Sequence, residues 1–350
     1  MTESTATCRP DHPVRIAGAM GSPYSLKMRA VLRYRRIPFQ WVLRNSKWDD
    51  LPPPPVALLP AVSFPAQDGS YPDAMIDSSP LIMRLEEWAT GRSLLPTDPV
   101  AAFCDYLLED YGDEWVTKQM FHYRWWYADA VAKAGKLLPL DLDEQMPAEV
   151  HARSTAYIVD RQQGRMALVG CNEGNRPVIE RSYERLLDLF ESHLADHPFL
   201  LGNRPGRGDF GIFGQLSQLV GWDPESARVA IDRAPRVVHW VSIADDLGWL
   251  PVDGDDGWAD ASDLPDAVGP LLHEVGRTYA PFMVANAAAL AAGADEVVCA
   301  IDGHEYRQAP FAYQGKCLLW LREGYHALDD GARRSVDALL EGTGCGRLFR

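Results

Sequence analysis

The segment from Val14 to Tyr34 constrains the fold of this chain most. Residues 14–20 predict a short apolar strand, Gly21-Ser22-Pro23 interrupts it, and Leu26 to Arg36 predicts a helix with one apolar face. Ser22 therefore lies where a strand ends and a helix begins. The first backbone N–H groups of a helix have no partner within it, and the helix dipole favours negative charge there.

Ser22 has two interpretations. No base-like residue stands beside it, so a hydrolase-type nucleophile is disfavoured, but its hydroxyl can donate a hydrogen bond to an anion such as a thiolate. Alternatively, Ser22 or Ser25 only caps the helix, because Ser is a preferred N-cap residue. The Tyr24 hydroxyl competes for the same role toward a thiolate.

Two later segments favour a binding site. Leu59 to Phe64 predicts a strand with Pro60 near its start, where a proline is tolerated. A cis Leu59-Pro60 bond would turn the Leu59 backbone outward to pair with an extended peptide. Asp77 and Ser78 precede a helix that begins near Pro80. Asp77 is suited to an ammonium group, and Ser78 to a carboxylate.

These motifs together resemble the glutathione transferase family. The matching segments occur in the family's order: Ser-Pro-Tyr-Ser-x-Lys-x-Arg at 22–29, Leu-Pro-Ala-Val at 59–62, and Asp-Ser-Ser-Pro-Leu-Ile at 77–82. A further match lies at 199–205 and 208–210. The resemblance implies an α+β fold.

The same resemblance implies a domain order. Residues 14–96 would form a thioredoxin-like domain with a mixed four-stranded sheet, and residues 97–250 an all-helical domain. Residues 1–13 are expected to be disordered or extended. Residues 251–350 exceed the usual family length and predict a mostly helical C-terminal extension with a small hairpin at Asp302-Gly303. The sequence does not decide whether this extension covers the active-site cleft or serves an oligomer interface.

By resemblance, glutathione would be a co-substrate lying across these motifs. Ser22 would be catalytic and stabilise the thiolate, the Leu59-Pro60 backbone would hold the cysteinyl amide, and Asp77 with Ser78 would hold the γ-glutamyl end. No metal is expected, since neither the cysteines nor the histidines show metal-ligand spacing.

The helical domain contains an aromatic run at residues 120–127, too many large rings to share one helix face. Tyr123 and Trp126, together with Tyr24, are expected to form the pocket for an apolar second substrate. The alternative is that these rings are core and interdomain packing.

One departure from the family pattern lies between the matches at 199–205 and 208–210. Members normally have Ser or Thr three residues before Asp209, where it caps a helix, but this chain has Gly206. The reciprocal cap is therefore incomplete, and Asp209 is expected to be structural.

Charge and composition limit the partners. The net charge of −15 argues against nucleic acid or an anionic membrane as the main partner. The first thirteen residues lack the apolar run of a signal peptide, and the six cysteines form no Cys-x-x-Cys pair, so a cytoplasmic location is expected. A homodimer is expected from the resemblance alone.

The function expected is a glutathione-dependent transferase that joins the glutathione thiolate to a small apolar electrophile. The alternatives are a glutathione-assisted isomerase, dehalogenase or ether-cleaving enzyme at the same site, or a non-catalytic binding protein that retains the fold.

Overall fold

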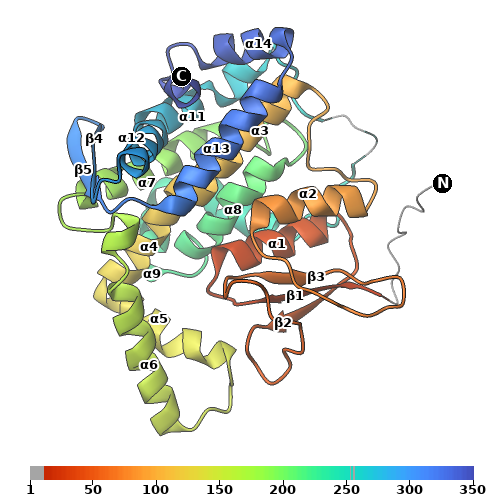
Figure 1. Cartoon of the computed structure of the whole chain (residues 1–350), viewed down its shortest axis with the longest axis vertical. Helices are drawn as coiled ribbons and strands as arrows, with labels where there is room; N and C mark the ends of the chain where they lie inside the picture. Colours follow the sequence, from red (N-terminus) through yellow and green to blue (C-terminus); the bar gives the residue numbers. More distant parts are fainter. Residues whose placement is uncertain (1–11, 253, 255–256) are drawn as a thin grey trace.

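The computed structural model describes residues 12–252, 254 and 257–350, so the segment expected to be extended at 1–13 lies mostly outside the described residues. The first domain has a three-stranded sheet in the order β2-β1-β3, with β2 parallel and β3 antiparallel to β1. Helices α1 and α2 cover the face of the sheet that points toward the rest of the molecule (Figure 1). The elements are β1 (Val14–Gly18), α1 (Pro23–Tyr34), β2 (Phe39–Leu43), β3 (Ala61–Ser63) and α2 (Ser78–Trp88).

The expected four-stranded sheet is corrected to three strands. The segment predicted as the fourth strand pairs only through one bridge, in which Val62 and Met75 exchange two backbone hydrogen bonds of 2.8 Å. Pro72 has no N–H to donate to a ladder, which shortens the pairing on that side.

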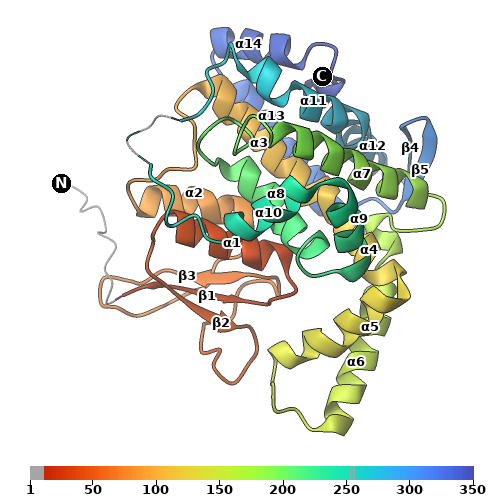
Figure 2. The same cartoon turned by 180° about the vertical axis from the view of Figure 1, so that it is seen from behind.

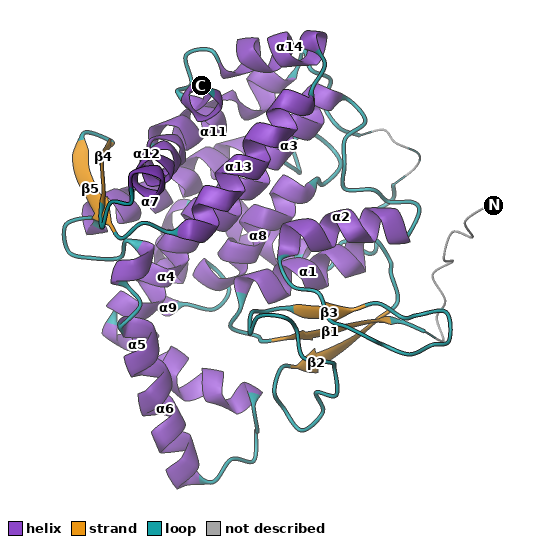
Figure 3. Cartoon of the chain, viewed as in Figure 1, coloured by secondary structure: helices purple, strands orange, loops and turns teal. Residues whose placement is uncertain are grey.

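The helical region begins with one long helical rod. Figure 3 shows α3 and α4 one after the other; the residues between them form a π-helical turn, and the rod ends at Tyr127, whose ψ of 131° is extended. The sequence over 100–134 predicts one long or kinked helix, whereas the structure has two α-helices joined by a π turn and then a break at Tyr127. The elements are α3 (Pro99–Tyr111), the π turn (Gly112–Val116), α4 (Thr117–Trp126), α5 (Ala128–Leu137), α6 (Ala148–Gln163), α7 (Arg176–His193), α8 (Arg207–Leu219), α9 (Pro224–Arg233) and α10 (Pro235–Ala244).

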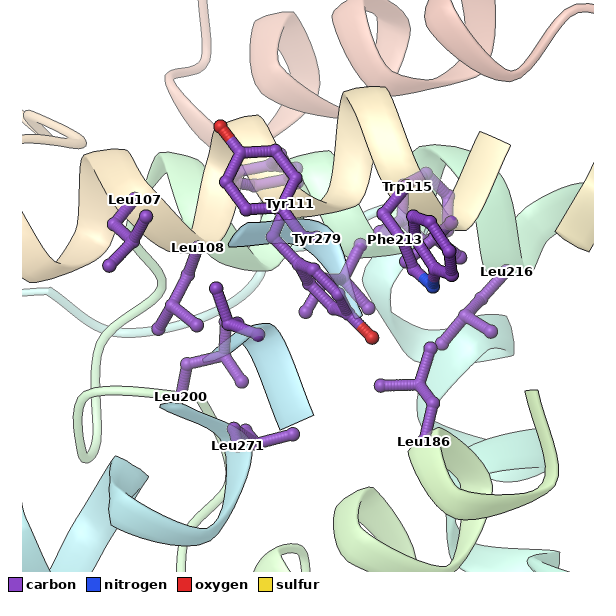
Figure 4. Packing of buried hydrophobic residues seen from close by; sticks show 14 of the residues in the cluster. Leu107, Leu108, Tyr111, Trp115, Leu186, Leu200, Phe213, Leu216, Leu271 and Tyr279 are labelled. Carbon is purple, nitrogen blue, oxygen red and sulfur yellow. The ribbon is translucent and has the colours of Figure 1, made fainter. Parts of the chain in front are cut away.

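The C-terminal extension is part of the same core. In Figure 4, Leu271 and Tyr279 of the extension lie among Leu108, Tyr111 and Trp115 of the rod. All of these side chains are buried, so the extension completes the helical core and is not a detached appendage. Its elements are α11 (Leu264–Arg277), α12 (Tyr279–Ala292), β4 (Val297–Ile301), β5 (His304–Gln308), α13 (Ala312–Ala327) and α14 (Asp330–Leu340).

Helix α8 lies at the centre of the helical region and is buried along its whole length. It crosses the π turn so closely that a Cβ on Gly112 would lie 2.7 Å from the backbone of Gly211. On its other side α8 packs against α1, which ties the helical region to the first domain. None of the described helices is both long and apolar enough to cross a membrane.

The N-terminus of α8 explains why glycine replaces the expected Ser or Thr. The carboxylate of Asp105, on α3, accepts hydrogen bonds of 2.9 Å from the backbone N–H groups of Arg207 and Gly208. A Cβ on Gly206 would lie 2.6 Å from the Asp105 carboxyl carbon. Asp105 therefore takes over the capping role, and only glycine fits beside it. Asp209 accepts from the N–H groups of Gly206 (3.0 Å) and Leu200 (2.9 Å), which is a structural role.

Candidate functional site

A cavity of about 800 Å³ lies between the first domain and the helical region, beside Ser22. Ser22 is the N-cap of α1, and its Oγ accepts a hydrogen bond of 3.3 Å from the N–H of Ser25. The side chain is half-buried and lines the cavity, so its hydroxyl proton is available to a ligand. Capping and ligand binding, which the sequence left as alternatives, are compatible at this residue.

Tyr24 also lines the cavity, but its hydroxyl is engaged within the protein. It donates a hydrogen bond of 2.8 Å to the backbone oxygen of Asp113 and lies 3.3 Å from Thr117 Oγ1. Burial, reinforced by Glu114 and Asp113, raises the pKa of Tyr24 well above its usual value. Between the two competing hydroxyls, the geometry favours Ser22 as the donor toward a thiolate.

The Leu59-Pro60 bond is cis, the condition under which the sequence predicted an outward-facing Leu59 backbone. Leu59 lines the cavity together with Leu58 and with two prolines of the tetraproline stretch, Pro53 and Pro54. Pro60 itself is buried immediately before β3. An extended peptide in this part of the cavity would run past the end of β3.

Asp77 and Ser78 do not line the cavity and are already engaged by the chain itself. The Asp77 backbone has a positive φ of 80°, which is uncommon for a residue with a side chain. Its carboxylate accepts a hydrogen bond of 2.7 Å from the hydroxyl of Tyr313, at the start of α13 in the extension. No sequence pattern joins two residues that lie so far apart in the chain. The structure places this part of the extension directly over the predicted γ-glutamyl position.

The Ser78 hydroxyl belongs to a buried ionic network. Lys27 Nζ lies 3.1 Å from Ser78 Oγ and forms ion pairs with Glu109 (2.7 Å) and Asp113 (2.5 Å). Burial by itself lowers the pKa of Lys27, but Asp113 and Glu109 outweigh that effect and raise it above the usual value. Sequence reasoning did not identify Lys27, although it lies inside the Ser-Pro-Tyr-Ser-x-Lys-x-Arg motif.

Tyr123 and Trp126 are not where the sequence placed them, since neither side chain lines the cavity. The buried ring of Tyr123 packs against Tyr183 at 5.1 Å between centroids, and Trp126 stacks beside His122 at 5.2 Å. Phe121 and Trp125 line the cavity instead. They form an i, i+4 pair on a different face of α4, whereas α7 packs against the face that carries Tyr123.

The face of α4 that carries His122 is held by a carboxylate on α7. Glu180 accepts hydrogen bonds from His122 Nε2 (2.9 Å), Tyr127 Oη (2.6 Å) and Arg176 Nε (3.0 Å). Burial opposes its ionisation, but the bonds from His122 and Tyr127 lower the pKa of Glu180 to about 2. These partners account for Glu180 structurally. Within the described residues, no group of three or more His, Cys, Asp and Glu side chains is placed to hold a metal ion.

The sequence agrees with two protein-family models. Residues 17–93 match the glutathione S-transferase N-terminal domain, and residues 156–242 match the glutathione S-transferase C-terminal domain. The chain belongs to the glutathione S-transferase family. Its thioredoxin-like and helical domains follow the family order, and the chain continues to residue 350 beyond them. No curated protein matches this family member at the level of sequence.

Solved structures similar to this glutathione S-transferase family member are distant. One from Pseudomonas fluorescens Pf-5, with two glutathione bound, is 17% identical, covers 67% of this chain and 91% of its own, and has a TM-score of 0.37. A Tau class enzyme from mango, Mangifera indica, is 17% identical over 69% of this chain and 93% of its own, with a TM-score of 0.39. One from Methylobacterium radiotolerans, in complex with glutathione sulfonate, is 19% identical over 69% and 98%, with a TM-score of 0.34.

Proposed function

We propose that this protein is a glutathione-dependent transferase that joins the glutathione thiolate to a small, mainly apolar electrophile. One observation carries the proposal: the hydroxyl of Ser22 lies at the N-terminus of α1 and faces a cavity of about 800 Å³ whose wall includes Leu59. The family membership supports glutathione as the thiol, acting as a co-substrate.

The Ser22 hydroxyl would stabilise the thiolate. A free thiol has a pKa of about 8.5, so only a few per cent is ionised at neutral pH. Ser22 donates to the sulfur, and the unpaired N–H groups and dipole of α1 add favourable electrostatics. Each unit by which the thiol pKa falls corresponds to about 1.4 kcal/mol. Tyr24 is a poorer donor because its proton is already held by Asp113.

The remaining contacts would orient the two substrates. The Leu59 backbone would pair with the cysteinyl amide, and the Ser78 N–H at the start of α2 would meet the γ-glutamyl carboxylate. Asp77 would accept the ammonium group, displacing or sharing the Tyr313 hydroxyl that now binds it. Phe121 would hold the electrophile near the sulfur, and this proximity supplies much of the rate.

A specific observation favours a second candidate function. Asp77 and Ser78 are both engaged by other residues of the chain, so a non-catalytic protein that keeps the fold without binding glutathione is the main alternative. A glutathione-assisted isomerase, dehalogenase or ether-cleaving enzyme would use the same residues as the transferase and would differ only in its products. A cytoplasmic location and a homodimer remain predictions from the sequence.

Calorimetric titration with glutathione, combined with thiolate absorbance in the ultraviolet, tests the proposal. Wild type should bind and show thiolate, whereas Ser22→Ala should bind with the thiolate signal lost. Ser22→Gly keeps a tolerated N-cap residue, so it separates the hydroxyl from helix capping. Ser242→Ala, on the exposed face of α10, is the matched control. Absence of glutathione binding by wild type would refute the transferase and favour the non-catalytic alternative.

A further inference from the structure

The cavity has a second wall that the proposed function does not yet use. Helix α6, which Figure 2 shows projecting from the helical body with α5, contributes one continuous stripe to the cavity lining. The stripe comprises Ser154, Tyr157, Ile158, Arg161 and Gln162 of α6, which recur at helical spacing, and Arg165 in the turn that follows the helix. It combines an apolar end with a cationic end.

Arg161 and Arg165 are the arginines that line this cavity without an ion-pair partner among the described residues. Both are exposed and line it, and in the described part of the chain neither has a carboxylate within ion-pair distance. They stand out because the whole chain carries a net charge of −15. A cationic end with no internal partner is available to an anionic group on a ligand.

The other two arginines of the lining are already paired with carboxylates. Arg44 pairs with Asp49 at 2.8 Å, and the buried Arg124 pairs with Asp223 at 2.9 Å. The Asp141 carboxylate accepts a hydrogen bond of 3.0 Å from the N–H of Met20. Burial raises the pKa of Asp141, which makes its negative charge less favourable. Among the described lining residues, the unpaired cations are therefore the two of the α6 stripe.

The apolar surface between Ser22 and these cations fits a flat ring. Phe121 and Trp125 of α4 face the same cavity as Tyr157 and Ile158 of α6. Pockets that bind small molecules are commonly lined in this way, with apolar walls and a few polar groups that fix orientation.

We infer that the second substrate of this protein is an aromatic electrophile that carries a carboxylate, with the ring against Phe121 and Trp125 and the carboxylate on Arg161 and Arg165. The inference rests on the proposed function because it names the substrate class of the same site. When the electrophile is an aryl chloride, the glutathione thiolate forms a C–S bond to the ring carbon that bears chlorine, and chloride leaves with the C–Cl bonding pair. The thiol proton passes to solvent.

Two matched pairs of probes test the inference. The reactive pair is 4-chloro-3,5-dinitrobenzoate and neutral 1-chloro-2,6-dinitrobenzene, and the unreactive pair is 3,5-dinitrobenzoate and 1,3-dinitrobenzene. Calorimetry with the unreactive pair needs no glutathione, whereas turnover of the reactive pair requires it. The proteins are wild type, the double variant Arg161→Gln/Arg165→Gln, and Arg153→Gln, an exposed α6 arginine outside the cavity lining, as control.

Wild type should prefer the carboxylate over its neutral partner on the order of ten-fold, in Kd and in KM, and added salt should weaken the preference. The double variant should lose it while Arg153→Gln keeps it. The inference is overturned if wild type binds neither unreactive probe, shows no preference, or retains the preference in the double variant. It is also overturned if the double variant loses affinity for glutathione itself, because the arginines would then serve the co-substrate. A binding preference without glutathione-dependent turnover would refute the transferase but support the anion site.

Discussion

We predict that the N-terminus of α8 can be capped either by Asp105 or by a serine introduced at position 206, and that unfolding experiments can measure the difference. Asp105→Ala removes the acceptor for two buried N–H groups, those of Arg207 and Gly208. Each buried donor left unpaired costs about 1–3 kcal/mol; at about 1–2 kcal/mol for each of these two, the lower part of that range, the variant should lose about 2–4 kcal/mol of unfolding free energy. Gly206→Ser alone should cost a similar amount, because its Cβ would displace the Asp105 carboxylate and break the same bonds.

The double variant Asp105→Ala/Gly206→Ser should lose less unfolding free energy than the two single variants lose together. Without the Asp105 carboxylate, the serine at 206 has room, and its hydroxyl can cap α8 as in other family members. A Ser N-cap is worth about 0.5–2 kcal/mol, and the steric cost of Gly206→Ser disappears. We therefore expect the double variant to lose only about 2 kcal/mol, against a sum of about 4–8 kcal/mol for the two single variants, which gives a coupling of roughly 2–6 kcal/mol between the two sites.

Urea unfolding at pH 8, followed by circular dichroism and by tryptophan fluorescence, measures these free energies. Burial raises the pKa of Asp105 to about 7, so at pH 8 the capping group is the carboxylate. Gly269→Ser, at a helix position where a Cβ meets no atom within 4 Å, is the control and should be nearly additive with Asp105→Ala. Additivity of Gly206→Ser with Asp105→Ala within about 0.5 kcal/mol would refute the exchange of caps.

Three further predictions concern the buried charges and the extension. Tyr313→Phe frees the Asp77 carboxylate, so calorimetry should show glutathione binding several-fold tighter; unchanged affinity would argue against Asp77 as the ammonium site. Lys27→Met removes the cation of buried Asp113 and leaves buried Glu109 with only its longer ion pair to Arg207, at 3.4 Å, so it should cost about 3–5 kcal/mol in urea unfolding; a loss below 1 kcal/mol would contradict this account. Burial, and after it the charges of Asp110 and Asp113, raises the pKa of Glu114 from 4.5 to about 8, so the folded protein keeps this proton between pH 4.5 and 8 while the unfolded chain loses it. The free energy of unfolding should therefore fall as pH rises from 5 to 8. A Glu114→Gln variant should show a flatter dependence of this free energy on pH.

Local patterns in the sequence predicted the elements that contact their neighbours locally. The strand–turn–helix unit around Ser22, the strand at Phe39–Leu43 and the hairpin that turns at Asp302-Gly303 follow from alternation, helical periodicity and turn residues. The small residues over 270–292 predict a single helix, but the structure has two, broken at Thr278, whose φ and ψ are −114° and −66°. Thr278 is neither Gly nor Pro, so the sequence does not mark a break there. In the structure its hydroxyl donates a hydrogen bond of 2.8 Å to the Glu274 carbonyl.

The candidate site was predicted only where its residues lie in motifs. Ser22 and Leu59 face one cavity, but which hydroxyl is free depends on Tyr24 reaching Asp113, a contact between two domains. The choice between the two aromatic faces of α4 likewise depends on what packs against the helix, because a run of rings has no periodicity that selects a face. Packing against Tyr183 withdraws Tyr123 from the cavity.

The C-terminal extension affects how the candidate site would recognise its two substrates. It is buried into the same core as α3, and its helix α13 reaches back to the first domain, where Tyr313 binds Asp77. If glutathione binds as proposed, this contact would make it compete with the protein's own hydroxyl at one end of the site, while the α6 stripe leaves two unpaired cations at the other. Recognition would then shift away from the γ-glutamyl end and toward the second substrate. On this reasoning we expect a modest affinity for glutathione, and we expect the carboxylate of the electrophile to supply a larger share of the binding energy than the apolar ring alone.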